Sequence, residues 1–233
     1  MTVKRSILLL IVFLTFISCS ARIDGVVREG GAAELTLKAS LEPRTLALIR
    51  SLRNFMGGAD DSPVLDGPSI SRSMVSSSGI RSAALENTSS SALDGTISVA
   101  DIGDFLSSTR GRLITFTEGR EASSIVITLD KDSVPELISR LSPEAEGYLS
   151  ALMAPAVLGE TSTRQEYLDL VAAVYGRPLA DEIADSRIRA FIEFPRPLTA
   201  VQGGNALGKQ AEFDIPLLDI LVLEHPLRYE VSW

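Results

Sequence analysis

The chain of 233 residues has a single cysteine, Cys19, and a single histidine, His225. One cysteine cannot form a disulfide within the chain, and zinc or other transition-metal sites need several cysteine or histidine ligands. We therefore expect no disulfide framework, no such metal centre and no cofactor. A chain of this length buries roughly 70% of its unfolded surface, so it needs neither kind of cross-link in order to fold.

Common catalytic motifs are absent as well. The sequence has no Gly-x-Ser-x-Gly elbow, no Walker phosphate loop, no dinucleotide-binding glycine pattern and no His-Glu-x-x-His pair. Carboxylates such as Asp181 and Asp185 remain as candidate catalytic groups, but a spacing of one helical turn is typical of a solvated helix face. We expect a non-catalytic protein, and a carboxylate-dependent hydrolase of the cell envelope is the alternative.

Positive charge is scarce. There are 22 Lys and Arg residues against 30 Asp and Glu residues, which gives a net charge of −8 at pH 7. Loss of Lys4 and Arg5 with a leader would leave −10. Such a surface repels nucleic acid and anionic lipid head groups, and the sequence contains no basic run that would offset it. We expect no nucleic-acid partner.

The apolar run near the N-terminus is too short for a permanent membrane span. It extends from Ile7 to Ile17, about half of the ~20 residues that a spanning helix needs. Lys4 and Arg5 precede this run and small residues follow it, which is the three-part pattern of a secretory signal. The sequence predicts a signal peptide over residues 1–18.

Cys19 follows the apolar run, between Ser18 and Ser20. This stretch resembles the lipobox of bacterial lipoproteins, although Phe16 stands where that family prefers leucine. The resemblance implies that Cys19 receives a diacylglycerol, becomes the mature N-terminus and anchors the protein in the cell envelope through acyl chains such as palmitate. The anchor would lie in the inner or the outer membrane, outside the cytoplasm. An ordinary secreted protein with an incidental cysteine is the alternative.

Two segments predict β-hairpins. Residues 21–40 alternate apolar and polar side chains on both sides of Gly30-Gly31, and residues 113–129 do so around Glu118-Gly119. Apolar residues at helical spacing follow each hairpin. The two hairpin-plus-helix units are either an old duplication or two independent solutions of one packing problem.

Residues from about 57 to 95 are rich in Ser, Gly, Asp and Pro, and their periodicity is poor. We expect a long connection there, with one short helix and one edge strand. Further along, Thr163 and Glu166 have the spacing of a capping box, which predicts a helix that ends at Gly176. The apolar residues that this helix is expected to bury are Tyr167, Leu168, Leu170, Val171 and Val174.

The stretch from Ile215 to Leu223 has almost no polar side. A core segment buried on all sides would have this composition, and so would an apolar patch or cavity for a lipid or a protein partner. The residues that we take as candidates for such a patch are Ile215, Leu217, Leu218, Ile220, Leu221 and Leu223.

The run from Arg187 to Trp233 contains a strand that ends in proline (FIEFPRPL) and then a glycine turn. Another strand passes into IPLLDILVLEHPL before a last strand that ends in an aromatic residue. In these features it resembles the C-terminal part of LppM-like envelope lipoprotein domains. The resemblance implies a ferredoxin-like domain of sheet and helices on a lipid anchor, with a role in binding a lipid, an envelope ligand or an envelope protein. It implies no catalytic residues.

The last strand carries Leu227, Tyr229, Val231 and Trp233 on one side, and we expect these side chains to face helices. Hairpins and helices occur in blocks rather than in strand–helix–strand order. The sequence therefore predicts an α+β fold, with an antiparallel sheet built from hairpins and several helices packed on one face. We expect a single envelope domain over residues 19–233.

Overall fold

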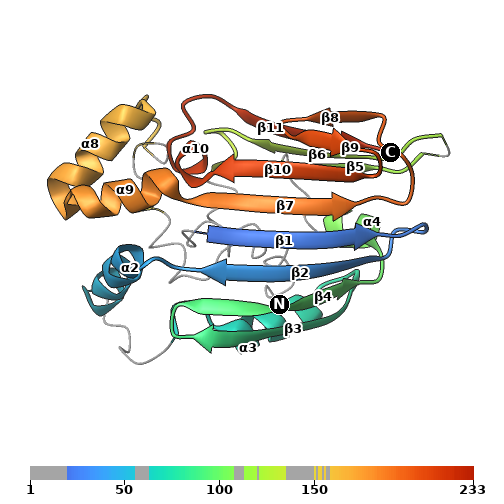
Figure 1. Cartoon of the computed structure of the whole chain (residues 1–233), viewed down its shortest axis with the longest axis horizontal. Coiled ribbons are helices and arrows are strands. Elements are labelled where there is room, and N and C mark those ends of the chain that lie inside the picture. Colours follow the sequence, from blue (N-terminus) through green and yellow to red (C-terminus); the bar gives the residue numbers. More distant parts are fainter. Residues whose placement is uncertain are drawn as a thin grey trace.

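The structure is a computed structural model of the whole chain, drawn in Figure 1. The residues that it describes are 20–55, 63–107, 113–119, 121–134, 150, 152, 153, 155 and 158–233. They form a mixture of helices and mostly antiparallel strands, so the predicted α+β class is confirmed. The prediction of one sheet is wrong, because the described strands form two sheets.

The larger sheet has the strand order β3-β4-β2-β1-β7-β10-β9. Its strands are β1 (Ser20–Val27), β2 (Ala33–Ser40), β3 (Ile80–Ser89), β4 (Ala92–Val99), β7 (Arg187–Glu193), β9 (Asn205–Leu207) and β10 (Gln210–Pro216). β1 and β2 form the hairpin that the alternating pattern predicted. β1 also lies parallel to β7, with Ser20 opposite Arg187, and the other described pairs in this sheet are antiparallel.

The two faces of the larger sheet differ as the alternation predicts. Ala21, Leu37 and Ala39 are at most 4% exposed, whereas their neighbours Arg22 and Lys38 are exposed. Side chains of successive strand residues point to opposite faces, so one set packs into the core while the other lies in solvent. One face of this sheet is therefore an open polar surface.

The smaller sheet has the order β5-β6-β11-β8 and contains the second predicted hairpin. Its strands are β5 (Ile114–Thr117), β6 (Ser124–Leu129), β8 (Ala200–Gln202) and β11 (Leu227–Ser232). The two hairpins lie in different sheets, and the helix expected after the second one lies mostly outside the described residues.

Aromatic side chains connect the two sheets. The ring of Trp233, which follows β11, lies 4.6 Å from that of Phe194, which follows β7. Tyr229 of β11 meets Phe213 of β10 edge to face at 5.9 Å. The last strand therefore faces the larger sheet, and the expectation that it faces helices is wrong. Aromatic residues bury more area than other side chains, which favours this face-to-face contact.

The described helices gather mainly at one end of the molecule. They are α2 (Pro43–Phe55), α3 (Gly67–Val75), α4 (Ile102–Ser107), α8 (Arg164–Tyr175), α9 (Arg177–Asp185) and α10 (Leu217–Val222). Figure 1 shows α2, α8 and α9 together beyond the end of the larger sheet where β1 begins. The carboxylate of Glu182 in α9 accepts hydrogen bonds from the backbone N–H groups of Arg44 and Thr45, at 3.1 and 3.0 Å. These bonds cap α2 and fix it against α9.

The stretch expected to be a connection is mostly regular structure. Within the described residues, it contains the expected short helix, α3, and the expected edge strand, β3, and the first residues of β4 also lie before residue 95. The weak pattern has a physical cause. β3 is an edge strand with one buried residue, Leu85. The backbone N–H of Leu85 donates a hydrogen bond to the hydroxyl oxygen of Ser71 in α3 at 2.7 Å.

The helix α8 begins as predicted but buries less than predicted. Thr163 and Glu166 form the expected capping box, and the backbone of Gly176 ends the helix at a φ of 92°. Tyr167 and Val171 are buried, whereas Leu170 and Val174 are 54% and 61% exposed. The prediction that Leu170 and Val174 are buried is therefore wrong, because α8 packs along a narrow stripe and leaves its outer side in solvent.

Candidate functional site

Cys19 lies outside the described residues, and the described chain begins directly after it. Ser20 is the first residue of β1 and its hydroxyl is hydrogen bonded to that of Ser40 at 2.8 Å. The predicted lipid attachment point is thus joined to a strand of the larger sheet without any intervening spacer residue.

The apolar stretch from Ile215 to Leu223 lies in the core. It forms the end of β10 and the short helix α10, and the residues from Leu217 to Leu223 other than Asp219 are at most 7% exposed. Ile215 is partly buried against the same core. The candidate patch of Ile215, Leu217, Leu218, Ile220, Leu221 and Leu223 is therefore not an exposed surface, and burial on all sides accounts for its composition.

A cavity of about 380 Å³ lies where β1 and β7 begin and β2 ends. We call it the β1-start cavity. Its charged lining residues are Arg22, Lys38, Asp94, Asp185, Arg187 and Arg189. The lining thus contains four cations and two carboxylates, on a protein whose net charge is −8. Ser20 and Ser40 add hydroxyl groups to the lining.

Most cations of this cavity have partners on the open sheet face. Arg22 donates to the carboxylate of Asp24 at 2.7 Å, and this hydrogen bond lowers the pKa of Asp24 below its ordinary value. The guanidinium of Arg22 also lies 4.4 Å from the ring centre of Phe191. Lys38 lies 3.5 Å from Asp94. These ion pairs are exposed and weak, so an anionic ligand can compete for the cations.

The β1-start cavity was not predicted from the sequence, and the reason is the spacing of its cations. Its cations come from three strands, and no two of them are adjacent in the sequence, so no basic run marks the site. Parallel pairing of β1 with β7 places Arg22 directly beside Arg189. The sequence contains no basic run, as expected, and these cations gather only through the pairing of the strands. The available signal was the alternation itself, which places Arg22, Lys38 and Arg189 on the polar faces of their strands.

A second cavity of about 280 Å³ lies at the other end of β1. It is lined by the turn after β1 and the turn after β5, which include Glu29 and Glu118, and by Arg196 and Trp233. The two glycine turns that look alike in the sequence thus face one cavity. The carboxylates of Glu29 and Glu118 are matched by Arg28 and Arg196, so the lining has no excess of either charge.

Of the two carboxylates considered as candidate catalytic groups, Asp185 lines the β1-start cavity and Asp181 lies in an ion pair. Asp181 pairs with Arg177 at 3.2 Å, and Glu182 caps α2 as described above. Among the described residues, no group of three or more His, Cys, Asp and Glu side chains is arranged to hold a metal ion.

Asp219 is the one acidic residue of the apolar stretch, and sequence analysis overlooked it. Its side chain is 12% exposed and lies 2.8 Å from the guanidinium of Arg164. The contact lacks hydrogen-bond geometry, and Oδ1 has no hydrogen-bond partner within the described part of the chain. Burial raises the pKa of Asp219 despite Arg164. Burial, with a smaller contribution from the charge of Asp219, also raises the pKa of Tyr229 to about 12.

The raised pKa of Asp219 makes a prediction about stability. A carboxyl group whose pKa is higher in the folded state increases the free energy of unfolding at pH values below its unfolded pKa of about 3.9. This contribution is lost as the pH rises through the pKa of the folded state. Asp219→Asn stays neutral, so its free energy of unfolding should increase relative to the wild type between pH 4 and pH 7. Urea unfolding across this range measures the difference.

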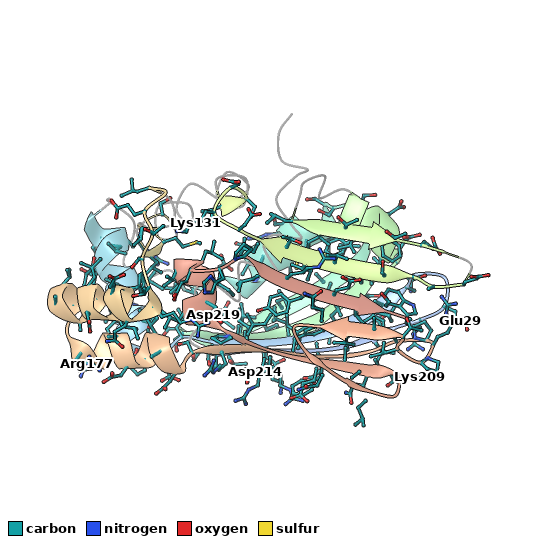
Figure 2. All side chains as sticks on the ribbon, turned by 90° about the horizontal axis from the view of Figure 1, so that it is seen from above. Glu29, Lys131, Arg177, Lys209, Asp214 and Asp219 are labelled. Atoms are coloured by element: carbon teal, nitrogen blue, oxygen red, sulfur yellow. The ribbon has the colours of Figure 1, made fainter. Side chains whose placement is uncertain are left out.

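The matched control is Asp214→Asn, which removes a carboxylate from the open sheet face (Figure 2). Asp214 is 52% exposed and lies 3.8 Å from Arg189, so this variant should change the free energy of unfolding by less than ~0.5 kcal/mol. If Asp219→Asn instead loses stability relative to the wild type towards pH 7, attraction to Arg164 outweighs burial.

No protein-family model matches the chain, and no curated protein does. No helix of the described residues is long and apolar enough to cross a membrane. The structure is similar to the NMR structure of the folded domain of LppM from Mycobacterium tuberculosis, with 9% sequence identity and a TM-score of 0.42. The similarity covers 91% of this chain and 87% of that domain.

Proposed function

We propose that the protein is a bacterial envelope lipoprotein, anchored through a diacylglycerol on Cys19, that binds a ligand and catalyses no reaction. The observation that carries this proposal is the position of Cys19. It ends a secretory signal pattern and directly precedes Ser20, where β1 begins. A lipid at Cys19 would place the β1-start cavity at the membrane surface.

The chemistry of that cavity supports an anionic ligand. Arginine binds phosphate and carboxylate groups through several N–H donors, and lysine adds a point charge. The cavity carries Arg22, Lys38, Arg187 and Arg189 next to the anchored end of the chain. The ligand that we propose is the phosphate-bearing head group of an anionic lipid in the anchoring membrane.

Lipid attachment predicts a defined mature N-terminus. In cells given labelled palmitate, the wild type should incorporate the label, and mass spectrometry should find a mature chain that begins at a diacylglyceryl Cys19. Cys19→Ala should incorporate no label, because alanine has no thiol to carry the lipid. Membrane anchoring is then measured by partition into the detergent phase, which the wild type should enter and Cys19→Ala should not. Two or more acyl chains hold a protein in a membrane durably.

Ser18→Ala is the matched control, since it changes the neighbouring residue but keeps it small. This variant should be labelled as the wild type is. A wild-type mature chain that begins at another residue, or that carries no lipid, would contradict the proposal and favour an ordinary secreted protein.

A further inference from the structure

The C-terminal half of α8 leaves apolar side chains in solvent. Leu170, Val174 and Tyr175 are 54%, 61% and 51% exposed, and we call these three residues the α8 apolar face. The sequence from Leu170 to Gly176 contains no charged residue. Exposed apolar residues that stand alone are ordinary, whereas several close together commonly mark a contact surface. Leu170 and Val174 lie one turn apart on α8, and Tyr175 follows Val174 at its end.

The α8 apolar face lies at the anchored end of the molecule. Ser20 pairs with Arg187, which is separated from the end of α9 by Ser186 alone. From there α9 leads to Gly176, where the chain turns into α8. A helix of the length of α9 extends ~13 Å, so the corner between α8 and α9 projects well beyond the start of β1. Figure 1 shows this corner as the outermost part of that end, and Figure 2 places Arg177 there.

No spacer residue separates Cys19 from β1, so a lipid on Cys19 would hold the domain close to the membrane. Consecutive Cα atoms are ~3.8 Å apart, so Cys19 lies within that distance of the first residue of β1. A lipid on Cys19 holds Ser20 at the membrane surface. Parts of the domain that project past Ser20 in the same direction then meet the bilayer, and the α8 apolar face is such a part.

Charges of both signs surround this end, since α8 and α9 carry five carboxylates and two arginines. The helix α2 has three arginines and no acidic residue in its sequence PRTLALIRSLRNF, and Glu182 of α9 holds it at this end. Arg177, at the corner itself, is paired with Asp181 at 3.2 Å. The β1-start cavity adds its cations. The arginines of α2 and of the cavity lie beside the α8 apolar face at this end, and arginines close to exposed apolar residues favour contact with the interface between head groups and acyl chains.

We propose that the α8 apolar face inserts into the boundary between head groups and acyl chains of the membrane that holds Cys19. The partner is a lipid surface, and the inference rests on the proposed lipid anchor. The two contacts fix the orientation of the domain. The β1-start cavity then lies at the head groups, and the cavity beside Trp233 lies at the end away from the membrane.

The test uses the lipidated full chain in vesicles of phosphatidylethanolamine and phosphatidylglycerol. The attached lipid converts the thiol of Cys19 to a thioether, and Cys19 is the only cysteine of the chain. Val174→Cys therefore provides a single free thiol for an environment-sensitive fluorophore. The control is Leu207→Cys, an apolar residue that is 78% exposed at the opposite end, near Lys209 (Figure 2). Lipids that carry a nitroxide in the head-group region quench fluorophores in the interface, and iodide quenches those in water.

We expect severalfold stronger quenching by nitroxide lipid at residue 174 than at residue 207, and weaker quenching by iodide. Equal nitroxide quenching at the two positions would overturn the docking but leave the anchor standing. Protection of residue 174 from iodide without nitroxide quenching would also overturn it, because a protein partner or a second copy would then cover the face. A wild-type chain that washes off the vesicles would contradict the anchor itself.

Discussion

Trp233→Ala is expected to lower the free energy of unfolding by about 3–5 kcal/mol, the usual cost of truncating a buried tryptophan. Trp233 is 5% exposed and its ring lies between Phe194 and Phe116, at 4.6 and 6.3 Å. Its backbone N–H donates to the carbonyl of Ser123 at 3.0 Å, and its carbonyl accepts from the same residue at 2.9 Å. The loss is a large share of the ~5–15 kcal/mol that stabilises a typical domain.

Urea unfolding followed by far-ultraviolet circular dichroism measures this effect, since the variant has no tryptophan fluorescence. Leu207→Ala is the control, because Leu207 is 78% exposed and its truncation should cost less than ~0.5 kcal/mol. A loss below ~1 kcal/mol for Trp233→Ala would contradict a ring packed between the two sheets.

The second large effect concerns the β1-start cavity. The double variant Lys38→Gln, Arg189→Gln should bind anionic vesicles about thirtyfold more weakly than the wild type, because each cation near an anionic membrane contributes ~1 kcal/mol. The measurement is vesicle sedimentation at low salt, with an unlipidated chain that begins at Ser20 and so lacks Cys19. Without the acyl anchor, the affinity reports the protein surface.

Both substituted side chains are about three-fifths exposed, and their ion pairs with Asp94 and Asp214 span 3.5 and 3.8 Å. Exposed pairs of this kind contribute little to stability, so the double variant should remain folded. The matched control is Lys131→Gln, Lys209→Gln, which removes the same charge from residues that do not line the cavity; Figure 2 shows Lys131 on the side of the molecule away from Asp214, and Lys209 at the end away from Arg177. Equal losses for the two double variants would mean that total charge, and not the cavity, attracts the membrane.

The two membrane predictions concern different forces. Loss of cations weakens a long-range attraction that salt screens within about 10 Å at 0.1 M, whereas burial of the α8 apolar face is insensitive to salt. Raising the salt concentration should therefore reduce vesicle binding of the unlipidated chain while leaving nitroxide quenching at residue 174 of the lipidated chain unchanged.

Much of the local structure was predictable from the order of the residues. The hairpin of β1 and β2 follows from strict alternation around Gly30-Gly31, and α8 begins where Thr163 and Glu166 form a capping box. Both patterns act over a few residues, and the neighbours they require are neighbours in the sequence. The apolar composition of the stretch from Ile215 to Leu223 also marked a core segment correctly, although it did not exclude an exposed patch.

Errors occurred where burial depends on distant partners. Leu170 and Val174 have the spacing of buried residues, yet α8 has no neighbour on that side among the described residues and they remain exposed. The last strand faces a second sheet rather than helices, because its aromatic residues pack against Phe194 and Phe213. Helical spacing and alternation predict which residues share a face, but not what covers that face.

By itself, the sequence determined the leader pattern, the place of Cys19, the local strands and helices and the excess of acidic residues. Only the tertiary structure decided that β1 pairs with β7, that the strands divide into two sheets and that cations of three strands surround one cavity. The physical reason is the range of the interactions. Alternation and capping operate between residues close in the chain, whereas strand partners and cavities depend on how distant segments pack together to bury their apolar faces.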